Sequence, residues 1–258
     1  MLLSGGLTYS QNFDSLSNSP AASSGTWTDN ATPGLTGWYA SRAYVSGTTS
    51  AFGPFAYTTY RVGDGSANNG SVWSLGTIGS TDRALGSIGS GTPKTNVFGL
   101  RLLNDTASPL NNLTISYTGE QWRNGGNTAV HTLAFSYQAS YTPFSSPIDT
   151  GSEPNNGWVG FSGLDFNTPT TGATATALDG NAAANRTLFS NVVISGILLL
   201  PGEEIFLRWR DIDDSNNDHG FGVDDFSLAF SIAVPEPSTL SLAGLGLLSI
   251  VCWRKLRR

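Results

Sequence analysis

The chain has 258 residues, of which only 12% are charged, about half of the roughly 25% usual in soluble domains. Its formal net charge is −6, which argues against a nucleic-acid binder because such proteins carry a basic surface. One cysteine and two histidines exclude an intrachain disulfide and a cysteine-based zinc site.

The residues before the C-terminal segment predict short strands and no helix. Apolar side chains alternate with polar ones, as at Leu113, Ile115 and Tyr117, and clusters of Gly, Pro, Asn and Ser supply the turns. This pattern predicts an all-β antiparallel β-sandwich or jelly roll, concanavalin-like or carbohydrate-binding-like, over residues 7–233. The predicted strands are Leu7–Phe13, Gly37–Val45, Tyr57–Val62, Ser71–Leu75, Asn96–Leu103, Leu113–Arg123, Thr132–Ser140, Trp158–Leu164, Asn191–Leu199, Glu204–Asp211 and Asp225–Ile232.

Three features at the ends and in the middle of this domain add detail. We expect the first and last strands to lie side by side, as they do in jelly rolls. Gly86–Gly91 is expected to be a turn, because the Lys and Ser or Thr that complete a phosphate-binding loop do not follow it. Residues 1–6 retain only Leu2 and Leu3 as apolar side chains, and we interpret them as the remnant of a truncated signal peptide.

The richest candidate site is the acidic segment 211–225, which holds six Asp and two Asn residues between two predicted strands. Calcium takes six to eight oxygen ligands, and these side chains could provide them. The alternative is a solvated polar hairpin, because Asp and Asn also favour turns. The candidate calcium ligands are Asp211, Asp213, Asp214, Asn216, Asp218 and Asp224.

Aromatic residues form a second candidate site. A sugar ring stacks on an exposed aromatic ring, whereas a buried ring simply fills the core of a sandwich. The candidate glycan contacts are Trp38, Trp73, Trp122, Tyr141 and Trp158.

Signals of an enzyme are weak. Glu120 and Asp165 could form the carboxylate pair of a glycosidase, and His219 next to Asp218 could act as a base, but neither spacing is specific. His131 opens a predicted strand. The sequence therefore predicts a protein that is not an enzyme.

The last 25 residues have a composition of their own. Pro235, Glu236 and Pro237 are followed by an uncharged apolar run, for which we predict a transmembrane helix at about 238–253. Arg254, Lys255, Arg257 and Arg258 form a basic end that the positive-inside rule places in the cytoplasm. Without residues 234–258 the chain has 9 basic and 18 acidic residues, so the acidic part lies on the other side of the membrane.

This tail resembles the PEP-CTERM sorting signal of exported bacterial proteins. The resemblance implies that an exosortase recognises Pro235–Pro237 and cuts nearby, after the helix has held the protein in the inner membrane. It also implies export to the cell surface or the extracellular polysaccharide matrix. Asp224–Leu228 resembles the closing strand of concanavalin-like and carbohydrate-binding jelly rolls. Tyr117–Arg123 and Leu207–Asp211 resemble segments of uncharacterised exported bacterial proteins, which imply no activity.

Three classes of function remain open. The first is a structural or adhesive component of the cell surface or of the polysaccharide matrix. The second is a calcium-dependent carbohydrate-binding module, with polysaccharide as its partner. The third, and weakest, is a secreted hydrolase.

Overall fold

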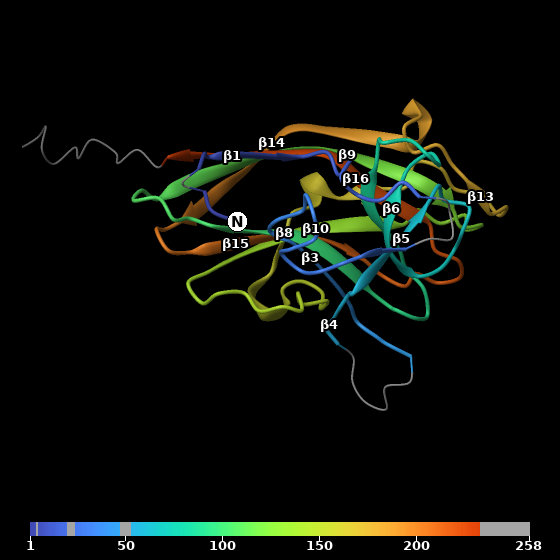
Figure 1. The fold of residues 1–258 in the computed structure, drawn as a ribbon, viewed down its shortest axis with the longest axis horizontal. Coiled ribbons are helices and arrows are strands. Elements are labelled where there is room, and N and C mark those ends of the chain that lie inside the picture. The colour runs from blue at the N-terminus through green and yellow to red at the C-terminus, as the bar shows by residue number, and fades with distance from the viewer. Residues whose placement is uncertain (4, 20–23, 47–52, 233–258) are drawn as a thin grey trace, which may run out of the picture.

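The structure is a computed structural model that describes residues 1–3, 5–19, 24–46 and 53–232. These residues form two β-sheets, shown in Figure 1, and short 3-10 turns at Asn155–Gly157 (η1), Ser162–Leu164 (η2) and Ala183–Asn185 (η3). The predicted all-β, two-sheet architecture is confirmed, and the predicted C-terminal helix lies outside the described residues. The strands are β1 (Thr8–Gln11), β2 (Ser24–Thr26), β3 (Trp38–Arg42), β4 (Phe55–Ala56), β5 (Thr59–Gly63), β6 (Ser71–Leu75), β7 (Ala84–Ile88), β8 (Asn96–Leu103), β9 (Leu110–Asn124), β10 (Thr132–Ser140), β11 (Val159–Gly160), β12 (Phe166–Asn167), β13 (Thr176–Ala177), β14 (Arg186–Leu199), β15 (Glu204–Asp211) and β16 (Gly220–Ile232).

The two sheets differ in size. The first runs in the order β13-β9-β16-β7-β6-β5-β2, and β1 and β14 pair with β16 and β9. The second runs in the order β11-β10-β15-β8-β3-β4, and β12 pairs with β10. The first and last strands are antiparallel neighbours, with Tyr9 opposite Leu228, as predicted. Pairing is antiparallel except between β5 and β6.

The core lies between the sheets and is rich in aromatic rings. Trp209 of β15 is at its centre, stacked on Trp38 and Phe98 and in edge contact with Tyr117 and Phe226. These residues come from both sheets, because period-two alternation turns every second side chain of each strand inward. Trp209 therefore contacts side chains of both sheets in the core.

β7 and β16 are among the strands that differ from the sequence prediction. The predicted turn at Gly86–Gly91 is wrong for its first half, because Gly86 and Ile88 belong to β7. A Cβ at Gly86 would lie 2.0 Å from the carbonyl oxygen of Phe221, so only glycine allows β7 and β16 to pair here. β16 also begins at Gly220 rather than at Asp225, because its glycine-rich start does not alternate.

The segment between β10 and β11 covers the outer face of the second sheet. Ile148 and Trp158 of this segment pack on Tyr39, Val97 and Phe206 of that face. Arg208, which is fully buried, holds the segment in place. Its guanidinium lies 3.8 Å from the Trp158 ring centre and donates hydrogen bonds to Asp149 O, Gly151 O, Glu153 Oε1 and Ser136 Oγ.

Residues 1–3 are packed in the same domain. Leu3 is buried in the core, and its backbone N–H donates to Leu103 O at 3.1 Å. The Met1 amino group donates to Arg101 O at 3.2 Å. The interpretation of residues 1–6 as a signal-peptide remnant concerns processing and stays a prediction, as do the domain boundaries.

Candidate functional site

The acidic segment forms the connection from β15 to β16 and rests on the connection from β9 to β10. One side chain holds it there. Asn127 Nδ2 donates to the carbonyl oxygens of Ser215 (2.8 Å) and Asn217 (3.1 Å), while Asn127 Oδ1 accepts from the backbone N–H of Ala129 (3.0 Å). Because both ends of this amide are used, its orientation is fixed.

Two buried histidines, His131 and His219, pack beneath the loop with ring centres 4.4 Å apart. His219 Nδ1 accepts from the backbone N–H of Gly125 at 2.9 Å, and its Nε2 lies 3.1 Å from Ala129 O. The proton of His219 is therefore on Nε2, where it is donated to that carbonyl. Both ring nitrogens have backbone partners, so His219 supports the fold and is not poised as a base beside Asp218.

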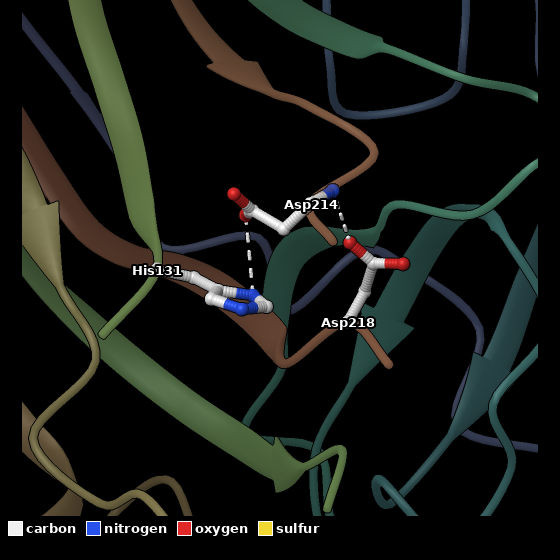
Figure 2. Close-up of side chains that lie close together, drawn as sticks. All are labelled: His131, Asp214 and Asp218. Atoms are coloured by element: carbon white, nitrogen blue, oxygen red, sulfur yellow. Dashed lines mark hydrogen bonds and ion pairs between the residues drawn. The ribbon is translucent and has the colours of Figure 1, made fainter. Parts of the chain in front are cut away.

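His131 faces a carboxylate. Its Nδ1 lies 3.2 Å from Asp214 Oδ2, as Figure 2 shows, and its Nε2 lies 3.0 Å from Asn127 Nδ2. Since an amide nitrogen only donates, Nε2 accepts one of the two Asn127 hydrogens, shared with a loop carbonyl oxygen, and the proton of the neutral ring is on Nδ1, directed at Asp214. The His219 N–H is 3.4 Å from the same Nδ1, at the outer limit of a hydrogen bond, and the carboxylate contact is the stronger. Burial lowers the pKa of His131, which favours this neutral form.

Asp218 completes a small polar cluster. Its Oδ1 accepts from the Asp214 backbone N–H at 2.8 Å (Figure 2). Burial raises the pKa of Asp218 to about 7, and the charges of Asp213 and Asp214 add to this. One ligand atom each from His131, Asp214 and Asp218 lie within 4.8 Å of one another. This is the arrangement that most resembles a metal centre in the described residues.

The hydrogen bonds limit which of these atoms could bind a cation. A metal on His131 Nδ1 would move the ring proton to Nε2, which faces the fixed Asn127 amide nitrogen. The imidazole therefore does not fit as a ligand, whereas the carboxylates of Asp214 and Asp218 do. Two carboxylates supply fewer than the six to eight oxygens that calcium takes, so backbone oxygens and water would have to complete its shell.

The other four predicted calcium ligands are not part of this cluster. Asp213 forms an ion pair with Lys94 at 3.0 Å, and Asn216 is exposed in a left-handed conformation. Asp211 is buried at the end of β15, where desolvation holds its pKa well above the usual value. Asp224 lies on β16, and burial and the nearby Glu120 raise its pKa to about 8. The six predicted ligands are thus not gathered in one place.

His131 was not among the predicted ligands, because it lies far from the acidic segment in the sequence. Its position follows from strand pairing. β10 runs antiparallel to β15, with Ala134 opposite Arg210, so the start of β10 lies next to the end of β15. A pairing of these two predicted strands is the signal that could have placed His131 at the loop.

Most of the candidate glycan contacts are in the interior. Trp38, Trp73, Trp122 and Trp158 are at most 3% exposed, because each fills a core cluster or lies beneath a covering segment. A buried ring has no free face for a sugar, so these four assignments are corrected to packing. Tyr141 is 60% exposed and stays a candidate.

The two carboxyl groups considered as a glycosidase pair have separate partners. Glu120 Oε2 on β9 accepts from Trp122 Nε1 at 2.8 Å, and burial raises the pKa of Glu120 to about 7. Asp165 Oδ1 accepts from the Phe135 backbone N–H of β10 at 2.7 Å. Glu120 is therefore bonded within the first sheet and Asp165 to a strand of the second sheet.

The C-terminal tail was compared with known families. Residues 233–258 match the PEP-CTERM protein-sorting motif. The PEP-CTERM match includes Pro235, Glu236, Pro237 and the four basic residues, and it confirms the resemblance seen in the sequence. This motif is recognised by exosortase, and it marks an exported protein that is processed at the membrane. Its residues lie outside the described part of the structure. Within the described part, no helix is long and apolar enough to span a membrane.

The β domain was compared with curated sequences and solved structures. No curated protein sequence is significantly similar to the chain. A solved structure of TmCBM61 in complex with beta-1,4-galactotriose has 8% identity and a TM-score of 0.27, over 60% of this chain and 74% of that one. This similarity is too low to support a conclusion about the β domain, which is therefore described from its own residues.

Proposed function

We propose that the protein is an exported structural or adhesive component of the cell surface or the polysaccharide matrix, with a jelly-roll domain as its working part. The PEP-CTERM match at residues 233–258 carries this proposal. The charge distribution supports it, because four of the 13 basic residues lie in the last five positions and the rest of the chain is acidic. A basic end stays in the cytoplasm, while the acidic domain is translocated.

The order of events follows from the sequence of the tail. The apolar run at about 238–253 would anchor the chain in the inner membrane, with Arg254, Lys255, Arg257 and Arg258 on the cytoplasmic side. Exosortase would then recognise Pro235, Glu236 and Pro237, cut nearby and separate the domain from its anchor. The two prolines keep this segment extended, as a protease substrate must be.

The test is to replace Pro235 and Pro237 with Ala and to follow the chain by cell fractionation and immunoblotting. The uncut form should accumulate in the inner membrane, because the helix can then extend into the recognition segment. Pro201→Ala, at an exposed turn after β14, is the matched control and should be processed normally. Equal amounts of processed protein in the double variant and the wild type would contradict the proposal.

A calcium-dependent carbohydrate-binding module is the second candidate, because Asp214 and Asp218 converge in the acidic loop. Millimolar calcium should raise the melting temperature of the protein, and Asp214→Asn with Asp218→Asn should remove this effect. A glycan array with and without chelator would then show whether calcium controls sugar binding. Identical melting curves in calcium and in chelator would exclude this candidate.

A further inference from the structure

A polar cavity of about 240 Å³ lies beside the acidic loop. Asp213, Asn216, Asn217 and Asp218 of the loop form one part of its lining, and Arg123 of β9 forms another. The rest comes from neighbouring turns, including Gly91. The cavity is half open, and its lining carries both hydrogen-bond acceptors and a cation.

Arg123 has an unusual environment for a buried arginine. It is 92% buried, yet no carboxylate among the described residues lies within ion-pair distance of it, and desolvation alone lowers its pKa. Buried arginines are normally paired with an anion, because an isolated buried charge is costly. The carboxylates of Asp213 and Asp218 line the same cavity but do not reach Arg123.

The free part of Arg123 is one specific edge of the guanidinium. Nη1 donates to Gly65 O (2.9 Å) and Ser66 O (3.1 Å), so that nitrogen is satisfied. Nε is buried and has no hydrogen-bond partner, and no described residue accepts a hydrogen bond from Nη2. Nε has no surface open to solvent, so Nη2, at the outer end of this edge, is the nitrogen that an anion in the cavity can reach.

We propose that this cavity binds a sugar acid, a hexuronate residue of an acidic polysaccharide, with a carboxylate oxygen on Nη2 of Arg123. The inference rests on the proposed function, since it names the class of polysaccharide that the domain would contact. Asp218, Asn216 and Asn217 supply oxygens for the sugar hydroxyls, which a simple inorganic anion would not use. Lys94 already neutralises Asp213, so the loop presents less negative charge to the ligand.

The test uses the full-length chain in detergent micelles, with glucuronate, glucose and acetate as titrants in calorimetry. Glucuronate should bind, and glucose and acetate should each bind at least about tenfold more weakly, because each lacks one half of the contacts. Arg123→Lys keeps the charge but has no nitrogen at the position of Nη2, and it should weaken glucuronate binding to a similar extent. A thermal melt of each variant checks that it is folded.

Gly91→Trp tests the position of the site without touching Arg123. A Cβ at Gly91 meets nothing within 4 Å, so the indole can be added at the rim of the cavity without a clash. It should abolish glucuronate binding, whereas Gly5→Trp, at another open glycine, should not. Full glucuronate binding by folded Gly91→Trp would overturn the proposal. So would binding of glucose, acetate or the zwitterion glycine to the wild type as strongly as glucuronate.

A chain that binds glucuronate but is not processed at its PEP-CTERM motif would instead contradict the proposed function alone.

Discussion

Glu120 and Asp224 are two carboxyl groups that the fold buries close to each other on β9 and β16, at 2% and 5% exposure. Desolvation is the main reason that their pKa values rise to about 7 and about 8. Glu120 also raises the pKa of Asp224, and the nearby Asp82 and Asp225 raise the pKa of both groups. Near neutral pH these groups therefore hold protons that the unfolded chain would release.

This difference predicts a fall in stability at alkaline pH. An acid with a raised folded-state pKa contributes stability that is complete below its unfolded pKa, near 4, and is lost as the pH rises through its folded pKa. Between pH 6.5 and 9 the free energy of unfolding should fall on the order of 2 kcal/mol, as measured by urea denaturation in the presence of chelator. The lowered pKa values of His131 and His219 act in the opposite direction, below about pH 6.5.

Asp224→Asn should remove a large part of this pH dependence. The amide has the shape of the protonated acid, keeps an oxygen for the Asp225 backbone N–H (2.7 Å in the structure) and does not ionise. The variant should melt several degrees higher than the wild type at pH 8.5, and this difference in melting temperature should be clearly smaller at pH 5. Asp179→Asn, at an exposed turn, is the control and should melt like the wild type at both values. A lower melting temperature of Asp224→Asn at pH 8.5 would show that the carboxylate is needed in its charged form.

At the scale of elements, the segment between β10 and β11 depends on Arg208. Arg208→Lys retains a charge but loses the planar fork and the stacking on Trp158, and it leaves several carbonyl oxygens without a donor. We expect the free energy of unfolding to fall by about 3 kcal/mol. Limited proteolysis should then cut within residues 141–158. Arg186→Lys on exposed β14 should do neither, and an unchanged urea midpoint for Arg208→Lys would mean that packing alone holds the segment.

The pairing of β7 with β16 predicts a matched pair of glycine variants. Gly86→Ala places a methyl group against the Phe221 carbonyl oxygen and should destabilise the domain by at least about 2 kcal/mol. Gly91→Ala, which meets nothing within 4 Å, should change the stability little. Equal thermal melts of the two variants would show that β7 and β16 can separate slightly without cost.

These elements also show which parts of the structure can be predicted from the sequence. β6, β8, β10 and β15 have the bounds that alternation predicted, because one side of each strand or both are apolar. β7 was missed because its glycine is required by the approach of β16, a strand more than 130 residues later. His131 joins the acidic loop, and Arg123 faces it, through contacts between distant strands. Local patterns therefore identify the elements and the loop but not the residues that other strands bring to it.

For the whole molecule, we predict that residues 1–232 fold without the PEP-CTERM motif. All strands of the described part lie within these residues, and removing the tail takes away four basic residues. Circular dichroism of this truncated chain should show strand and almost no helix, with a cooperative thermal transition. A non-cooperative transition would mean that the tail contributes to the fold.

The position of β16 in Figure 1 has a mechanical consequence. The PEP-CTERM motif follows this strand directly, and β16 is bonded to β9 on one side and to β1 and β7 on the other. A tension applied through the C-terminus pulls β16 along its own axis, so that its hydrogen bonds are loaded together in shear instead of opening one after another. If the tail anchors the chain as proposed, β16 carries the load, and the domain should stay folded under that tension.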